Sequence, residues 1–440
     1  MAMHSSEEAF KYIESFANLE KNTSVTSSEY KLERMSYMLN VMGHPEKTFK
    51  SVHIAGSKGK GSTATIAATM LASQGYKTGL YTSPHLTSYT ERITLAGITF
   101  EEKVYMDCIN SLEEKIISGE LTGPYGMPTT FELLTLLAFL VFKQERCDWA
   151  VIEVGLGGRL DATNLIMPEV CIITPIELEH CEILGNTLEE IATEKAGIIK
   201  PGIPVVLQQQ KSEAMAVFNK KASSQNSRLL NIRDFTSIYD LNTTNSGINF
   251  KLIIRNKLNL DIHTNLTGDF QVDNIASAIL ALDYVIKDFN YTNALNSLKN
   301  VKLEGRFEII NGNPPIVIDG SHTAFSIEKL CSSVKNMFGF GGVLIFGSVK
   351  GKNFKVMLDE LASNFRAIII SEPQGLKETD IESVYRYAKE NFREIPVLLE
   401  KSPEAALKKA ISLELDGPVV ITGSFYLAGA VKKILKRRTV

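Results

Sequence analysis

The sequence lacks the cysteine pattern of a disulfide scaffold or a zinc site. Its 5 cysteines are an odd number in 440 residues, and no two of them stand at a C-x-x-C spacing. They are expected to be small core residues in a reducing compartment. The N-terminal stretch also has no basic patch followed by an apolar core, as a signal peptide would. Both absences predict a cytoplasmic protein.

Long apolar runs and an excess of one charge are also missing. No stretch approaches the roughly 18 apolar residues of a membrane-spanning helix, so we expect no membrane partner. Lys plus Arg total 47 against 50 for Asp plus Glu, and this balance gives no reason to expect a nucleic-acid partner. A hydrophobic content of 44% in 440 residues is typical of a globular chain with two or three domains. We expect a monomer.

Short apolar runs alternate with helical patterns over most of the chain. Because these runs are apolar at consecutive positions, they indicate strands covered on both faces, as in a parallel α/β sheet. The strands predicted for the first half lie at 51–55, 77–82, 148–154, 170–174 and 204–208. A second series at 316–319, 343–346, 367–370, 396–399 and 418–422 predicts a Rossmann-like domain.

A small antiparallel region is predicted between the two series. Apolar and polar residues alternate over 248–254 and again over 258–262, which indicates a hairpin with one solvated face. A helix over roughly 271–287 follows. The polar stretch 296–304 then separates the two halves, so we place the domain boundary there.

A glycine-rich loop, Gly56-Ser57-Lys58-Gly59-Lys60-Gly61-Ser62-Thr63, stands directly between the first predicted strand and a helical pattern. In this order, backbone N–H groups and the positive end of the helix dipole can converge on an oxyanion. Lys60 would add a point charge for the β- and γ-phosphates. One glycine separates Lys60 from Ser62, which departs from the usual G-x-x-x-x-G-K-[ST] pattern. We predict phosphate binding rather than a plain glycine-rich turn.

Polar residues that follow the predicted strands indicate a metal site near this loop. Ser83, Glu153 and His180 stand past strand ends, where open parallel sheets build their sites. A hydroxyl, a carboxylate and an imidazole suit Mg²⁺ that accompanies ATP. His180 alone would more often be a hydrogen-bonded loop residue. The presence of Glu153 and the phosphate loop favours ligation.

Lys195 falls on the buried face of a short predicted helix. A capping box of Thr187 and Glu190 begins this helix, and Gly197 is expected to end it. Lys195 follows Ile191 by four residues, so its side chain starts on the inward stripe. A buried amine must be paired, neutralised or modified. Helical geometry alone favours a salt bridge or a side chain that reaches solvent at its tip.

These motifs, taken in order, resemble the folylpolyglutamate synthase and dihydrofolate synthase family of the Mur ligase superfamily. The similar segments are 33–63, 79–93, 129–132, 153–164, 179–202, 305–308, 319–322 and 422–431. The resemblance implies an ATP-dependent ligase of folate biosynthesis that joins L-glutamate to the carboxylate of a pterin, dihydropteroate or a reduced folyl-glutamate, through an acyl phosphate. It also implies an α/β fold with a P-loop ATP-binding domain over 1–298 and a Rossmann-like glutamate-ligase domain over 299–440.

The resemblance implies roles for single residues as well. In the family, phosphates are held by the positions that correspond to Gly59, Lys60, Gly61 and Ser62. Magnesium is bound by the positions that correspond to Ser83, Glu153 and His180. The lysine that matches Lys195 is carbamylated, which turns a buried ammonium into an anion facing the metal site. Matches to Asn274, Arg306 and Asp319 contact the nucleotide, and the match to His322 lies near the incoming glutamate. Lys60, Lys195 and His322 are thus the implied catalytic residues.

Pterin contacts are expected at Phe131, Arg159 and Asp161. Each has a structural alternative, because Phe131 could be a core residue and Arg159 could form a local salt bridge with Asp161. At four places the chain departs from the family pattern, and these departures bear on the adenine contact and the glutamate pocket. The departures are Ser57-Lys58 for Thr-Asn, Glu179 for Asp, Phe270 for His, and Ser321 and Thr323-Ala324 around His322 for Ala and Asn-Pro.

Two other functions remain open. One is a related Mur-type ligase that acts on a different carboxylate, such as a peptidoglycan precursor, although the segments at 79–93, 129–132 and 153–164 argue against it. The other is a nucleotide-binding regulatory protein without turnover, which the joint presence of the predicted site residues disfavours. The sequence does not distinguish addition of the first glutamate from addition of later ones.

Overall fold

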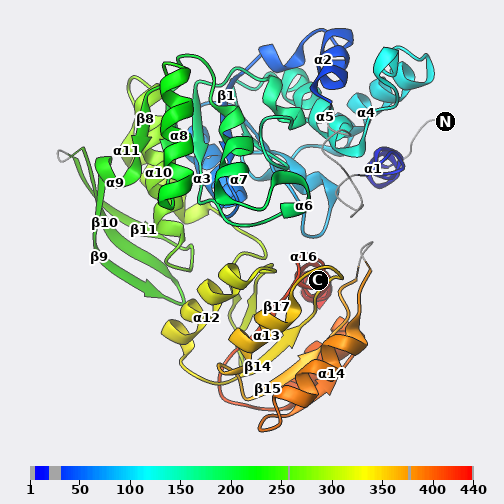
Figure 1. Cartoon of the computed structure of the whole chain (residues 1–440), viewed down its shortest axis with the longest axis vertical. Helices are drawn as coiled ribbons and strands as arrows, with labels where there is room; N and C mark the ends of the chain where they lie inside the picture. The colour runs from blue at the N-terminus through cyan, green and yellow to red at the C-terminus, as the bar shows by residue number, and fades with distance from the viewer. Residues whose placement is uncertain (1–4, 19–30, 256–257, 375–377, 439–440) are drawn as a thin grey trace. The chain divides into compact units, whose positions relative to one another are not determined.

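The computed structural model describes residues 5–18, 31–255, 258–374 and 378–438 (Figure 1). The chain forms two compact units. The first consists of Met1–Asp240, Phe250–His263 and Gln271–Val301, and the second of Leu241–Asn249, Thr264–Phe270 and Lys302–Val440. The boundary between the two functional domains, predicted between residues 298 and 299, stays a prediction.

The first unit contains a mostly parallel sheet. Its strands are β1 (Lys50–Ala55), β2 (Thr78–Tyr81), β3 (Ile93–Leu95), β4 (Ile98–Thr99), β5 (Trp149–Glu153), β6 (Val170–Ile173), β7 (Val205–Leu207) and β8 (Leu229–Asn231). The strand order in the described residues is β4-β3-β2-β5-β1-β6-β7-β8, and only the β2-β3 and β3-β4 pairs in it are antiparallel. The five strands predicted for this half are confirmed to within one residue at each end.

Helices cover both faces of this sheet. They are α1 (Ser6–Glu14), α2 (Leu32–Val41), α3 (Lys60–Ser73), α4 (Glu102–Ile117), α5 (Thr130–Gln144), α6 (Cys181–Leu184), α7 (Leu188–Lys195), α8 (Ser212–Ser224), α9 (Ile232–Phe235), α10 (Gln271–Val285) and α11 (Tyr291–Ser297). On one face, α1, α2, α4 and α5 pack over Tyr81 and Ile152, while α7 and α8 pack over Cys171 and Ile173. On the other face α3 packs against α10. This burial on both sides explains the continuous apolar runs of the strands.

A small sheet follows in the order β11-β10-β9, with β9 (Thr236–Thr244), β10 (Gly247–Ile254) and β11 (Leu258–Thr264). Its very short connections require antiparallel neighbours. The predicted hairpin corresponds to β10 and β11. The strand β9 was not predicted, because four of its nine residues are exposed, only one is buried, and its sequence shows no apolar alternation.

The second unit contains a sheet with the order β12-β13-β17-β14-β15-β16 in the described residues. Its strands are β12 (Glu308–Ile310), β13 (Ile316–Ile318), β14 (Val343–Phe346), β15 (Ala367–Ile370), β16 (Val397–Leu399) and β17 (Val419–Thr422). All pairs are parallel except β12 with β13. Its helices are α12 (Ala324–Phe338), α13 (Phe354–Ala362), α14 (Ile381–Asn391), α15 (Pro403–Ser412) and α16 (Phe425–Arg438). The predicted α/β fold class is thus confirmed.

Among the described residues, none of the helices has the length and apolar character needed to cross a membrane.

Candidate nucleotide and substrate site

The phosphate loop connects β1 to the N-terminus of α3. Gly59 caps the helix with φ of +84°, a left-handed conformation that glycine adopts without strain. The N–H groups of Lys60, Gly61 and Ser62 belong to the first turn of the helix, where no carbonyl of the helix itself can accept them. By contrast, the N–H groups of Ser57 and Lys58 both donate to the carbonyl of Pro175. The available donors are therefore those of the helix N-terminus.

Buried amides support this loop from α10. Asn274, only 3% exposed, accepts at Oδ1 from the Thr63 hydroxyl at 3.0 Å and from Nε2 of Gln208 at 3.1 Å. Its Nδ2 donates to Oε1 of Gln271 at 2.8 Å. A Cβ on Gly59 would lie 2.8 Å from Oδ1 of Asn274. Asn274 thus packs against the loop and orders it, and a direct contact with nucleotide stays a prediction.

Strand register brings the predicted metal ligands to one edge of the sheet. Parallel β5 and β1 pair Glu153 with Ile54, and β2 ends at Tyr81 beside Ile152. The backbone N–H of Ser83 donates to Oε2 of Glu153 at 2.9 Å, and the two residues are 8% and 2% exposed. The structure therefore places Ser83 and Glu153 together, one strand away from the phosphate loop.

His180 stands in a different environment. It caps the short helix α6 in a left-handed conformation, its side chain is 42% exposed, and its Nδ1 lies 3.8 Å from Oε1 of Glu182. No group of three or more His, Cys, Asp or Glu side chains in the described ranges is arranged to hold a metal ion. The hard oxygen donors of Ser83 and Glu153 fit Mg²⁺, which takes most of its remaining ligands from water and phosphate. Ligation by His180 stays a prediction.

Lys195 is buried, as its helical position predicted, with 2% of its surface exposed. Its Nζ donates to the carbonyl of Gly56 at 2.8 Å and to Oε1 of Glu179 at 3.2 Å. Lys58 approaches the other oxygen of Glu179 at 3.5 Å. The unmodified lysine is therefore paired, and Glu179 is a site residue that the sequence had marked only as a departure from the family pattern.

Burial and the charges of this cluster shift the pKa values of both Lys195 and Glu179. Burial lowers the pKa of Lys195 to about 8, with Glu179 opposing the shift and Lys60 adding to it. Burial alone would raise the pKa of Glu179, but the positive charges of Lys195, Lys60 and Lys58 outweigh it and hold that pKa well below its usual range. Glu179 is therefore a carboxylate at neutral pH, and an appreciable fraction of Lys195 is a neutral amine.

The end of α7 differs in one detail from the expectation. The capping box of Thr187 and Glu190 is confirmed, but Gly197 does not stop the helix with a left-handed turn. The helix instead passes into the 3-10 turn η6 (Ala196–Ile198). A Cβ at Gly197 would lie 2.4 Å from the Cα of Arg159. This glycine is required because the loop after β5, the predicted pterin loop (155–165), approaches the helix closely at Arg159.

The predicted pterin residues lie in the loop after β5, which contains Arg159 and Asp161, or against it, as Phe131 does. The half-buried ring of Phe131 lies against Gly155, where a Cβ would come within 2.3 Å of it. Arg159 pairs with Glu194 of α7 at 2.9 Å. The alternative of a salt bridge between Arg159 and Asp161 is therefore wrong.

Asp161 organises the loop from inside. It is 3% exposed and accepts from the N–H of Leu156 at 2.9 Å and from the N–H of Thr163 at 3.0 Å. Burial raises its pKa, and these hydrogen bonds oppose the shift. Its carboxylate is thus engaged within the loop, and contact with a substrate stays a prediction.

In the second unit, two of the predicted residues, Arg306 and His322, lie near Phe425, a residue that was not among the predicted site residues. The guanidinium of Arg306 lies 5.3 Å from the centre of the Phe425 ring, and the His322 ring lies 6.0 Å from it in an edge-on arrangement. The buried Asp319 accepts from the N–H groups of Phe307 at 2.7 Å and Ser321 at 2.8 Å. Phe425 could have been found from its place at the start of α16, directly after β17.

Two departures from the family pattern have structural explanations. Phe270 packs against the hydrophobic core of the second unit. The Thr323 side chain caps α12 by accepting from the N–H of Ser326. Both residues therefore serve local structure in this chain.

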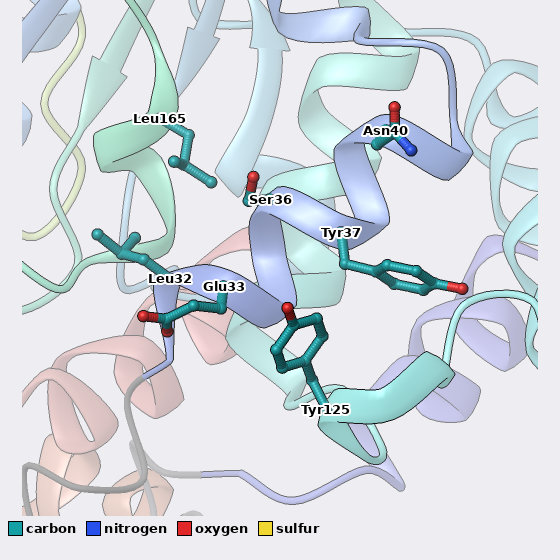
Figure 2. A pocket seen from close by; sticks show the side chains of 7 residues that line it. All are labelled: Leu32, Glu33, Ser36, Tyr37, Asn40, Tyr125 and Leu165. Atoms are coloured by element: carbon teal, nitrogen blue, oxygen red, sulfur yellow. The ribbon is translucent and has the colours of Figure 1, made fainter.

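The first unit is hollowed beside α2 and beside the loop after β5. An open groove of about 400 Å³ lies beside α2, and Figure 2 shows Tyr37 and Tyr125 projecting from opposite sides of it. None of the predicted site residues lines this groove. A smaller hollow of about 120 Å³ is lined by Arg159, Glu194 and neighbouring residues of the predicted pterin loop.

Comparison with known proteins gives concordant matches. Residues 54–282 match the Mur ligase middle domain, and residues 305–425 match the glutamate ligase domain of Mur ligases. The chain is 34% identical over 415 residues to dihydrofolate synthase/folylpolyglutamate synthase of Bacillus subtilis, covering 92% of this chain and 95% of the relative. It is 32% identical to folylpolyglutamate synthase of Lacticaseibacillus casei, covering 97% and 98%.

A solved structure agrees with these matches. E. coli FolC, in complex with DHPP and ADP, superimposes with a TM-score of 0.86 at 25% identity and covers 100% of both chains. The glycine-rich loop, the parallel sheet and the matched domains all lead to the same assignment. The chain belongs to the folylpolyglutamate synthase and dihydrofolate synthase family of Mur ligases, and it is an ATP-dependent glutamate ligase.

Proposed function

We propose that this ligase joins L-glutamate to the carboxylate of dihydropteroate, of a reduced folyl-glutamate, or of both. One observation carries the proposal: β1, which leads into the phosphate loop, lies in the sheet between β5, which ends at Glu153 beside Ser83, and β6, which precedes Glu179 and its partner Lys195. The Bacillus subtilis relative is named for both activities, which supports both acceptors. ATP would phosphorylate the pterin carboxylate, and the glutamate amine would then displace phosphate from the acyl phosphate.

The residues of the phosphate loop bind and orient the nucleotide in this proposal. The N–H groups of Lys60, Gly61 and Ser62 donate to phosphate oxygens, and the ammonium of Lys60 compensates their charge. Ser83 and Glu153 would hold Mg²⁺. When bound, this ion neutralises charge on the transferred phosphoryl group.

Lys195 would carry a carbamate. The neutral amine attacks CO₂, a C–N bond forms, and one proton is released to solvent. Burial supports this step because it lowers the pKa of Lys195 to about 8 and so increases the neutral fraction. Charge balance supports it too. Lys58, Lys60 and Lys195 face one carboxylate, Glu179, and conversion of one ammonium to an anion leaves two charges of each sign.

Phe131, Arg159 and Asp161 would form the pterin site, with Phe131 as the ring contact and Asp161 as the organiser of the loop. In the second unit, Arg306 and Asp319 would contact the nucleotide, and His322 would lie near the incoming glutamate. The solved complex of E. coli FolC with DHPP and ADP supports a pterin and a nucleotide as ligands of this fold.

All five cysteines are free and four are buried, which supports a cytoplasmic enzyme. A monomeric state remains part of the proposal.

A product assay tests this function. The purified chain is incubated with ATP, Mg²⁺, L-glutamate and either dihydropteroate, tetrahydrofolate or a muramyl-peptide precursor, and the products are resolved by mass. A mass increase of one glutamyl residue on a pterin is expected. Glutamylation of the muramyl compound alone would contradict the proposal. Absence of glutamate-dependent phosphate release with all three acceptors would instead favour a regulatory nucleotide-binding protein.

A further inference from the structure

A histidine is buried in the middle of the parallel sheet. His53 is 0% exposed in β1 and stands in register with Ile152 of β5 and Cys171 of β6. Register partners in parallel strands share a face of the sheet. His53 therefore lies on the same face as Ile152 and Cys171, which belong to two different apolar clusters. A polar ring at such a position calls for a reason beyond packing.

The ring is connected to the predicted pterin loop by hydrogen bonds. Its Nε2 lies 2.9 Å from the hydroxyl of Thr163, and this hydroxyl lies 2.5 Å from Oδ1 of Asp161. The other oxygen of Asp161 accepts from the N–H of Leu156 at 2.9 Å. The chain of contacts thus runs from β1 to the beginning of the loop after β5.

The protons in this series of hydrogen bonds can be assigned: His53 donates to Thr163, and Thr163 donates to Asp161. An ionised carboxylate can only accept, so Thr163 donates its single hydroxyl proton to Asp161. The Thr163 oxygen then accepts from His53, which must carry its proton on Nε2. The Nδ1 atom of His53 is buried and has no hydrogen-bond partner in the described part of the chain. An unpaired buried nitrogen costs free energy that an aliphatic residue would avoid, so the ring has no packing advantage at this position.

We propose that His53 is a positioning residue for the pterin: through Thr163 and Asp161 it fixes the loop at 155–165 in its binding conformation. This inference rests on the proposed function, in which that loop contacts the pterin. The loop is held at a further point, since Nδ2 of Asn164 donates to the carbonyl of Arg159 at 3.0 Å. His53 touches no substrate in this proposal. It acts by limiting the conformations of the residues that do.

Two pairs of variants test the chain of hydrogen bonds. His53→Leu removes the donor at similar volume, whereas the amide of His53→Gln can still donate to Thr163. Thr163→Val removes the hydroxyl, and Thr163→Ser keeps it. We expect His53→Leu and Thr163→Val to raise the KM for dihydropteroate or tetrahydrofolate about tenfold, the effect of losing one buried hydrogen bond. The KM for ATP should stay within about twofold of the wild-type value. The variants His53→Gln and Thr163→Ser should retain part of the pterin affinity that His53→Leu and Thr163→Val lose.

The double variant His53→Leu/Thr163→Val separates positioning from general destabilisation. If His53 acts through Thr163, the double variant should be no worse than either single variant. Val52→Ala is the matched control, because Val52 is 0% exposed in the same strand and makes no contact in this chain of hydrogen bonds. It should lower the melting temperature without changing the pterin KM.

The outcomes are distinguishable. A wild-type chain with no turnover on either pterin would contradict the proposed function. An active wild type whose pterin KM is unchanged in His53→Leu and Thr163→Val, or changes only as in Val52→Ala, would overturn the role of His53. If His53→Leu does not fold, the comparison of Thr163→Val with Thr163→Ser decides. A ¹⁵N spectrum that places the His53 proton on Nδ1 would also overturn the proposal.

Discussion

The buried Lys195 forms an ion pair with the largely buried Glu179 beside the phosphate loop, with Nζ 3.2 Å from Oε1, and the same Nζ donates to the carbonyl of Gly56 within the loop. This pair connects three segments: the end of α7, the loop after β6 and the loop after β1. Removal of one partner would leave the other as a buried, unpaired charge, which is strongly unfavourable. The two residues therefore have to be tested by changes that distinguish pairing from modification.

Carbon dioxide should control the activity if Lys195 is carbamylated. We expect ligation to fall when CO₂ and bicarbonate are stripped from the buffer and to recover when they are restored. Because carbamate formation needs the neutral amine, the recovery should be faster as the pH rises through about 8, the pKa to which burial lowers Lys195. The measurement is glutamate-dependent ADP release in degassed and in bicarbonate-supplemented buffer.

Lys195→Arg is the control for a purely structural pair, since arginine keeps the positive charge opposite Glu179 but forms no carbamate under these conditions. It should be folded and nearly inactive at any CO₂ concentration. Full activity of Lys195→Arg in CO₂-free buffer would contradict the modification.

Lys60→Ala should lower the rate of ligation strongly without unfolding the chain. Lys60 stands at the first position of α3 and compensates phosphate charge, so its loss should lower kcat by about 10²- to 10³-fold, as the loss of other electrostatic groups does. Steady-state kinetics and a thermal melt measure the two effects. The matched control is Lys220→Ala on the exposed face of α8, which should change neither. Wild-type turnover in folded Lys60→Ala would refute the phosphate-loop assignment.

Sequence patterns predicted the parts of this fold in which burial alone determines the pattern of apolar residues. The fully buried strands were located because both faces are covered, and the burial of Lys195 followed from its helical position relative to Ile191. The strands β3, β4, β8, β9 and β12 were missed, because short, exposed or edge strands carry no continuous apolar run. Their existence depends on tertiary neighbours rather than on local pattern.

The site was predicted less completely, because spacing along a chain does not determine hydrogen-bond partners. Asp161 and Arg159 are two residues apart, yet Arg159 pairs with Glu194 and Asp161 accepts from backbone N–H groups. Phe425 lies near Arg306 only after β17 and β13 have paired. Such long-range pairs have no signal in one sequence.

Acid should weaken the fold through His53. Burial, with a smaller contribution from Lys200, lowers the pKa of this histidine to about 3, whereas in the unfolded chain it titrates near 6.5. Cys171 and, through Thr163, Asp161 also face it. Since the unfolded state binds the proton more tightly, stability is present above about pH 6.5 and is lost as the pH falls. Between pH 7 and pH 5 the contribution of His53 to the loss should be about 2 kcal/mol.

Urea unfolding of the wild type and of His53→Leu at pH 7, 6 and 5 measures this contribution. The variant should lose less free energy of unfolding over this range than the wild type does. Parallel pH dependence of the two proteins would show that His53 is not the titrating group.

The predicted linker should be a preferred site of proteolysis. Lys299 and Lys302 are exposed within 296–304, and the second compact unit resumes at Lys302. Limited trypsin digestion followed by mass analysis should first give fragments that end at these lysines. The variant Lys299→Gln/Lys302→Gln should remove the cut. Early fragments that end elsewhere would count against a domain boundary at 298 and 299.

Phe425 should matter for the ligand-binding residues of the second unit. Its ring lies under the guanidinium of Arg306 and beside the His322 ring. Phe425→Leu removes the ring and its cation–π interaction, whereas Phe425→Tyr keeps both. We expect Phe425→Leu to lower kcat/KM for ATP and for L-glutamate about tenfold, while the pterin KM, which depends on the first unit, changes little. Phe340→Leu makes the same change at a ring that is 60% exposed and should have no effect. Wild-type kinetics in Phe425→Leu, with both substrates varied, would mean that Arg306 and His322 do not depend on this ring for their positions.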